Sequence, residues 1–440
     1  MAIFAAAADP QGARPLAPPH LNSGHGSPIV RGPELGSNHD IINRKTAEAM
    51  RQCILHVGMP KTGTSSIQEY LCRHLSDPNF LYIHFGEVNG TRALSTIGLE
   101  QPESYWVHRR NRVSPRRAAR MRARYVKHLL RSLRRAQELN RTPILSGEGC
   151  WHLTRNQLLR LKALIHDGGF DVRVIAYLRP YRSWLESSFQ QNVKWGTMRH
   201  NPLVSPEQGL VLRQSDYLRK LDHLADAFGE SNLLIRPFRR RVLEQGCAVH
   251  DFCAQVGIDG QGTSVPRSND GISLDAIRFF YAYAKFCREA DPPTVRQTNA
   301  LIHAMQSLAG EKLRFHPAVM APVADYVEQQ RARIHERFGV DLGDDPGGPG
   351  DGGAAEYAAA EDGAGTVIRT EQDMYRFSPE SLAWLAAQAG CAPIQGQGES
   401  AAREVALAVN RLRRRALWIH WRPLVRERLR MELNRWRPLA

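Results

Sequence analysis

Residues 53–66 read CILHVGMPKTGTSS, and this stretch decides the fold. An apolar run typical of a buried strand passes into a turn punctuated by Gly58 and Gly63, and the helical pattern SSIQEYLCRHL follows. Glycines let a backbone approach an anion closely, and the free N–H groups and positive dipole of a helix start hold a phosphate. The stretch therefore predicts a strand–turn–helix unit that binds the phosphates of a nucleotide.

The position of the lysine narrows the kind of nucleotide. A nucleoside-triphosphate P-loop follows G-x-x-x-x-G-K-[ST], with the lysine directly after the second glycine. Gly58 and Gly63 keep that spacing, but Thr64 occupies the lysine position and the lysine, Lys61, lies three positions upstream. A lysine inside the turn can cover the leaving phosphate of a donor with a single 5′-phosphate, whereas the standard position suits a triphosphate carrying Mg²⁺. The alternative is an ordinary strand–turn–helix with a surface lysine.

Apolar strand-like runs alternate with helical patterns after this unit. The helical pattern SWLESSFQQNV occupies 183–193, and helical patterns dominate from 273 to 338. The strand-like runs are PILSG at 143–147, RVIAYL at 173–178 and NLLIRPF at 232–238. This order predicts an α/β domain with a central parallel sheet flanked by helices.

A second candidate anion site lies in residues 174–188, VIAYLRPYRSWLESS. Arg179 ends the strand, and Ser187 lies about two turns into the following helix. Arginine supplies a permanently charged fork and serine a hydroxyl donor, so both can contact one phosphate. Ser183 and Ser188 are weaker candidates for the serine.

The two segments together resemble the 3′-phosphoadenosine 5′-phosphosulfate (PAPS)-dependent sulfotransferase family. The resemblance rests on P-K-T-G-T-[ST] after a strand and on an arginine followed eight positions later by a serine, and it covers about residues 50–340. It implies a P-loop-like three-layer domain, with PAPS as the donor and a reaction that needs no metal. No metal-ligand spacing such as H-E-x-x-H or a paired C-x-x-C is present in the sequence.

The same resemblance implies which residues bind the donor. Arg179 and Ser187 match the element that binds the 3′-phosphate, and Arg267 is a looser candidate to complete that pocket, the alternative being a solvent-exposed loop arginine. The 5′-phosphosulfate is expected to contact Lys61, Thr62, Gly63, Thr64, Ser65 and Ser66.

In-line sulfuryl transfer benefits from a base at the acceptor hydroxyl and a cation at the departing phosphate oxygen. Lys61 can be that cation. The strand-like run 143–147 delivers Glu148 to the sheet edge where ligands bind, so Glu148 is the expected base, and S-x-E resembles glutamate-using carbohydrate sulfotransferases. The alternative is that Glu148 caps the next helix, with His152 and His56 as reserve bases.

The expected acceptor is a hydroxyl or amine, with a carbohydrate or glycolipid favoured through the resemblance. Two other functions stay open at this point. A P-loop kinase using ATP and Mg²⁺ would share the strand–turn–helix unit. A non-catalytic protein that binds polyanions or membranes would share the basic surfaces.

The net charge of +15 is concentrated in two segments. Residues 109–135 carry twelve Arg or Lys and no acid, and residues 403–437 carry eleven Arg and three Glu. The helix expected at 116–135 is either a solvated face or a groove wall for an acidic glycan or lipid headgroup. The basic amphipathic helix at 400–440, kinked or broken at Pro423, fits an anionic membrane surface or a partner subunit. No module for specific nucleic-acid recognition accompanies this charge.

Composition divides the chain and indicates its compartment. The seven cysteines form no C-x-x-C pair and fit reduced thiols, the apolar start is interrupted at Asp9 before a signal peptide is complete, and no uncharged stretch approaches the roughly 20 residues that span a bilayer. A cytoplasmic protein, at most peripheral at a membrane, is expected.

The expected parts are a disordered tail (1–48), a sulfotransferase domain (49–342), a Gly/Ala/Asp-rich linker (343–366), a short docked helical segment (367–392) and a basic helical tail (400–440).

Overall fold

The computed structural model describes residues 50–196, 201–204, 216–259, 272–288, 293–343 and 367–434, with the side chains of the last helix placed as far as residue 416. The tail expected at 1–48, Arg267 and all but one residue of the linker expected at 343–366 lie outside the described residues. None of the helices that are described has an apolar stretch long enough to cross a bilayer.

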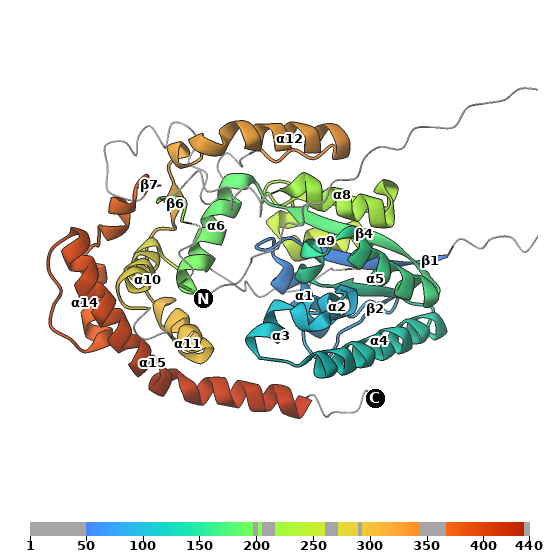
Figure 1. Ribbon diagram of the computed structural model, residues 1–440, viewed down its shortest axis with the longest axis horizontal. Helices are drawn as coiled ribbons and strands as arrows, with labels where there is room; N and C mark the ends of the chain where they lie inside the picture. Colours follow the sequence, from blue (N-terminus) through green and yellow to red (C-terminus); the bar gives the residue numbers. More distant parts are fainter. Residues whose placement is uncertain are drawn as a thin grey trace, which may run out of the picture.

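A five-stranded parallel sheet forms the centre of the molecule (Figure 1), which confirms the predicted α/β class. The order of its strands is β2-β3-β1-β4-β5. In the middle strand, Leu55 pairs with Leu145 on one side and with Val174 on the other. The strands are β1 (Arg51–Gly58), β2 (Phe80–Tyr82), β3 (Thr142–Ser146), β4 (Phe170–Leu178) and β5 (Leu233–Pro237).

Helices cover both faces of this sheet because alternate residues of β1 point to opposite sides and all of them from Cys53 to Gly58 are buried. Leu55 packs with Leu133 and Leu161 in one core cluster, whereas Ile54 packs with Ile67 and Phe252 in the other. The helices of this part are α1 (Thr64–Arg73), α2 (Thr91–Gly98), α3 (Trp106–Arg110), α4 (Pro115–Glu138), α5 (Arg155–Asp167), α6 (Tyr181–Lys194), α8 (Tyr217–Phe228) and α9 (Ala248–Val256).

A second group of helices includes the predicted helical region at 273–338, and most of it lies beyond the carboxyl ends of the strands, whereas the helix Ala324–Phe338 lies beside α8 (Figure 1). A short parallel pair, β6 (Arg314–Phe315) and β7 (Val367–Ile368), links two of its segments. The helices are α10 (Leu274–Phe286), α11 (Val295–Met305), α12 (Ala324–Phe338), α14 (Pro379–Ala389) and α15 (Gly398–Asn434). The 3₁₀ turns are η1 (Pro102–Ser104), η2 (Glu148–His152), η3 (Glu230–Asn232), η4 (Glu244–Gly246), η5 (Pro317–Val319), η6 (Ala321–Val323) and η7 (Glu371–Tyr375).

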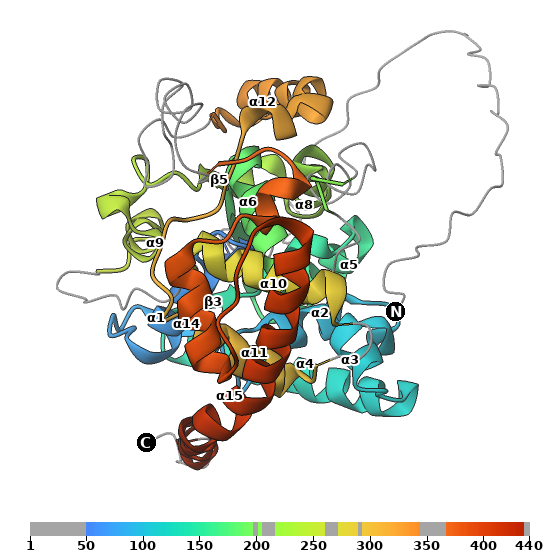
Figure 2. The same cartoon turned by 90° about the vertical axis from the view of Figure 1, so that its left-hand side faces the viewer.

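The first half of α15 is part of the main core. Figure 2 shows α14 and α15 against α10 and α11. Val405, Val409 and Leu412 are buried in the same cluster as Leu55 of the central strand. The helix continues through Pro423. Helix α14 lies within the helical segment expected at 367–392 and begins at a serine cap, where the Ser378 side chain accepts a hydrogen bond from the backbone N–H of Ser381 at 3.1 Å.

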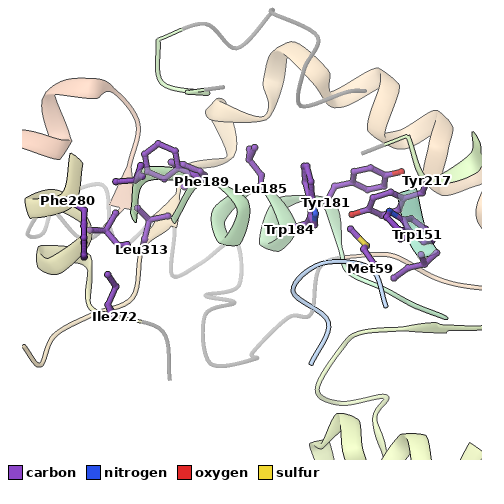
Figure 3. Packing of buried hydrophobic residues seen from close by; sticks show 14 of the residues in the cluster. Met59, Trp151, Tyr181, Trp184, Leu185, Phe189, Tyr217, Ile272, Phe280 and Leu313 are labelled. Atoms are coloured by element: carbon purple, nitrogen blue, oxygen red, sulfur yellow. The ribbon is translucent and has the colours of Figure 1, made fainter. Parts of the chain in front are cut away.

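Helix α6 joins the sheet to the second group of helices. Its apolar side carries Trp184, Leu185 and Phe189, and all three belong to the main core cluster. Figure 3 shows that this row runs from Met59 and Trp151 at the sheet to Phe280 and Leu313 at the other end. Because Met59 lies in the turn after β1, the same packing fixes that turn relative to α6.

Candidate functional site

The strand order places the candidate site. The connection after β1 leads towards β2 on one side of the sheet, and the connection after β4 leads to β5 on the other. In open α/β sheets ligands bind outside the carboxyl ends of the strands, where the direction of winding reverses. Lys61 follows β1 and Arg179 directly follows β4, so the fold brings these two predicted residues to that point.

The turn after β1 has a backbone shape suited to an anion. Lys61 and Gly63 have φ values of 73° and 74°, so two left-handed residues are separated by one other residue. Turns of this kind direct successive N–H groups into a concave anion site, and a non-glycine residue in this conformation is strained. Such strain is concentrated at functional sites. A Cβ atom on Gly58 would lie 2.3 Å from Oγ1 of Thr64, so the turn also needs glycine at its start.

The hydroxyl side chains of the turn divide into two groups. Thr62 Oγ1 donates a hydrogen bond to the carbonyl of Met59 at 2.7 Å, and Thr64 Oγ1 is buried without a partner among the described residues. Ser65 is exposed and Ser66 is half-buried. The threonines thus shape the turn from inside. In the first turn of α1, the backbone N–H groups before Ser66 have no partner within the helix and are therefore available to an anion.

The Lys61 side chain reaches α6. Its Nζ donates a hydrogen bond to Oε1 of Gln191 at 2.8 Å. Burial lowers the pKa of Lys61, and the charge of Arg179 lowers it further, whereas the nearby Glu148 carboxylate raises it. Lys61 is therefore half-buried, held by a neutral amide, and electrostatically coupled to both other predicted site residues.

Arg179 is fixed to the turn rather than free in solvent. Its Nη1 donates to the Lys61 carbonyl at 2.8 Å and its Nε donates to Ser183 Oγ at 3.1 Å. The guanidinium lies over the Phe238 ring, 5.8 Å from the centroid. The predicted partner Ser187 lies one turn further along α6, and the serine to which Arg179 donates is Ser183, the weaker candidate.

Glu148 is the first residue of η2, directly after the strand that was expected to deliver it. The carboxyl group is half-buried, and burial raises its pKa while the Lys61 charge lowers it. The alternative, that Glu148 caps the next helix, is wrong. Thr154 caps α5 in a capping box with Gln157, whose side chain accepts from the Thr154 N–H at 3.0 Å.

The two reserve histidines lie in different surroundings. His56 is fully buried within β1, where Nδ1 is 2.8 Å from Ser146 Oγ and the ring lies near Phe252. Burial lowers the pKa of His56 to about 3, so it stays neutral inside the core. His152 ends η2 and is exposed. Of these candidates, Glu148 is the one coupled electrostatically to Lys61.

Two polar residues of α6 complete this cluster, and neither was predicted. Gln191 holds Lys61, and Lys194 lies one turn beyond it, half-buried. Burial and the positive charges of Lys61 and Lys312 lower the pKa of Lys194 to about 8. The 4, 4 and 3-residue spacing from Ser183 through Ser187 and Gln191 to Lys194 is the sequence signal for this polar face.

The one acidic residue of α6 is already paired. Glu186 is buried, and its two oxygens accept from the Phe315 N–H at 2.9 Å and from Arg314 Nη1 at 3.3 Å. Lys61 is coupled to the Glu148 carboxylate and Arg179 to Glu186, whereas Lys194 is coupled to the cations Lys61 and Lys312, so positive charge is in excess and the site is suited to an anion. No group of three or more His, Cys, Asp or Glu side chains that would hold a metal ion occurs in the described part of the chain.

Comparison with known proteins adds little to this geometry. No protein-family model matches the chain, and no solved structure matches it. An uncharacterized protein of Archaeoglobus fulgidus is 29% identical over 116 residues. That match spans 26% of this chain and 30% of the archaeal protein, whose name states no activity.

Proposed function

We propose that the protein is a sulfotransferase that moves a sulfuryl group from PAPS to a hydroxyl of an acceptor, with a carbohydrate or glycolipid as the favoured class. One observation carries the proposal. Lys61 lies in a turn that has the glycine spacing of a P-loop but a displaced lysine. Arg179 donates a hydrogen bond to its carbonyl at the carboxyl edge of the sheet, and the half-buried Glu148 is electrostatically coupled to its ammonium group.

The donor would bind across this edge with its two anionic ends apart. The left-handed turn and the start of α1 suit the 5′-phosphosulfate, because both present N–H groups to an anion. Arg179 suits the 3′-phosphate. Its described hydrogen bonds use two of the five N–H donors of a guanidinium, so three remain for a ligand. Ser187, on the same face of α6 as Ser183, would add a hydroxyl.

The reaction needs one proton transfer and one charge stabilisation. The acceptor oxygen attacks sulfur while the bond between sulfur and the bridging phosphate oxygen breaks. The acceptor proton passes to Glu148, for which a raised pKa means a stronger base than an exposed carboxylate. Lys61 stabilises the negative charge on the departing oxygen of adenosine 3′,5′-bisphosphate.

Calorimetry with adenosine 3′,5′-bisphosphate, set against ATP plus Mg²⁺, tests the donor assignment on the intact protein and on Arg179→Ala. We expect metal-independent binding of the bisphosphate that is lost in the variant. Transfer of labelled sulfate from PAPS to a panel of glycans then tests the reaction. Preference for ATP with Mg²⁺ would indicate a kinase, and bisphosphate binding without turnover on any acceptor would indicate a non-catalytic binding protein.

A further inference from the structure

Helix α4 has two opposite faces of different character. Ala118, Leu129, Leu133 and Ala136 are buried against the sheet and its neighbours. At about 100° per residue, the exposed basic residues all fall within an arc of about 100° on the other side. This α4 basic stripe consists of Arg116, Arg117, Arg120, Arg124, Lys127, Arg131, Arg134 and Arg135.

The charge of the α4 basic stripe is almost unneutralised. No acidic residue occurs between positions 109 and 135. Within the described residues, the stripe forms one ion pair, between Arg135 and Glu138 at 3.5 Å. Solvated helix faces usually intersperse acids at three- and four-residue spacing, because like charges one turn apart repel each other. A line of eight cations without such acids is therefore suited to bind an external anion.

The stripe is also long and straight. From Arg116 to Arg135 it extends about 28 Å at 1.5 Å per residue. Helix α4 ends shortly before the amino end of β3 and is far longer than that strand, so its first turns reach past the carboxyl edge of the sheet. Figure 1 shows α4 beginning beside α3 and running towards the end of the molecule where β1 starts. One end of the stripe therefore lies on the side of the molecule that carries Lys61.

We propose that the α4 basic stripe binds a linear polyanion of the acidic-glycan class, carrying sulfate or carboxylate groups. The large apolar side chains that are exposed in the described residues, such as Trp106 and Leu407, lie outside α4. A helix that enters a membrane surface needs such side chains along its length, and binding of single-stranded nucleic acid relies on aromatic rings. Charge alone, in a line one helix wide, fits a glycan chain. This inference rests on no part of the proposed function.

Two matched variants of the full chain test the proposal, because each removes four positive charges. The stripe variant carries Arg116→Gln, Arg120→Gln, Lys127→Gln and Arg131→Gln. The scattered variant carries Arg155→Gln, Arg296→Gln, Arg333→Gln and Arg411→Gln, at exposed positions of four other helices. Glutamine is a good helix former, so both variants should fold, and circular dichroism checks this.

The probe is a labelled heparin oligosaccharide, and its binding is measured by fluorescence polarisation at several salt concentrations. We expect the affinity to fall roughly tenfold or more in the stripe variant and to change little in the scattered variant, with binding weakened by salt. A third variant with lysine at Arg116, Arg120 and Arg131 keeps the charge and should retain binding.

Three results would overturn the proposal. Equal losses in the stripe and scattered variants would mean that net charge alone binds the probe. Unchanged binding by the stripe variant would place the site elsewhere. Tighter binding of the wild type to phosphatidylserine-containing vesicles, or to single-stranded DNA, than to the oligosaccharide would assign the stripe to a membrane or to nucleic acid.

Discussion

At Lys61 the backbone and the side chain serve separate purposes. The left-handed backbone costs about 1 kcal/mol in any residue except glycine, whereas the ammonium group belongs to the proposed chemistry. Lys61→Gly should therefore be more stable than Lys61→Ala by about 1 kcal/mol in urea unfolding. Both variants should lose sulfuryl transfer. Equal stabilities of the two variants would mean that the turn is not left-handed in solution.

The lowered pKa of Lys194 predicts that the affinity for an anionic ligand depends on pH. Its pKa is lowered to about 8, so the side chain is charged below that pH and loses its charge as the pH rises through it. The affinity for adenosine 3′,5′-bisphosphate should fall over this range, and Lys194→Arg should reduce the fall because arginine does not titrate there. Calorimetry at a series of pH values checks both curves. An alkaline loss that is identical in the variant would exclude Lys194 from the site.

The ionisation of Glu148 should determine how the activity declines at low pH. Its carboxylate must be ionised to accept a proton, and burial raises its pKa above the usual range. On acidification, the activity should therefore begin to fall at a higher pH than it would if the base were an exposed glutamate. Glu148→Gln should lower kcat by roughly 10²-fold or more with little effect on bisphosphate affinity. Full activity of Glu148→Gln would assign the base elsewhere.

At the scale of single elements, α4 contains one arginine with a different function from the stripe. Arg122 Nη2 donates to the carbonyl of Glu100 at 2.7 Å and to that of Leu99, and its Nε donates to that of Thr96 at 3.3 Å, so it binds the carboxyl end of α2. Arg122→Met should lower the free energy of unfolding by about 1–3 kcal/mol, because carbonyls lose their donors. The exposed neighbour Arg124, changed to Met, should alter it by no more than about 0.5 kcal/mol. Equal effects in urea unfolding would contradict this role.

The elements themselves were largely predictable, because strands such as β1 and β4 contain mostly apolar stretches at 53–58 and 174–178. The contacts between elements were not. Gln191 meets Lys61 across 130 residues of sequence, and an amide on a helix carries no signal of its own. Helical spacing puts Arg122 on the side of Leu129 and Leu133, but the sequence does not show that its partners are the carbonyls at the end of α2. Ser187 was preferred over Ser183 on family spacing, whereas the rotation of α6 brings Ser183 to Arg179.

At the scale of the whole molecule, one core cluster extends from the central strand to α15. Sequence reasoning treated residues 400–440 as a basic amphipathic tail, since arginines dominate their composition. In the first half of α15 most of the apolar residues between those arginines are nevertheless buried, and Arg413 itself is buried with Nε bonded to Asn410 at 3.0 Å. Burial depends on what the rest of the chain places beside the helix.

Two leucines of α15 test whether this core is one cooperative unit. Leu412 is 1% exposed and Leu407 is 59% exposed. Leu412→Ala should lower the free energy of unfolding by about 2–5 kcal/mol, and Leu407→Ala by about 0.5 kcal/mol or less. Circular dichroism and tryptophan fluorescence should report the same transition in both variants. A separate early transition in Leu412→Ala would mean that the C-terminal helices unfold independently.

Helix α6 binds Lys61 through Gln191 on one side, and on the other its apolar row packs from Met59 to Phe280. An anion that immobilises the polar side must therefore also restrain the helices packed on the apolar side, because both are faces of one rigid rod. By thermodynamic linkage, a ligand bound tightly at the sheet edge raises the free energy of every opening that separates α6 from α10, and α15 is restrained because it packs on α10. The saturated protein should exchange the amide hydrogens of α15 for deuterium more slowly, far from any atom of the ligand.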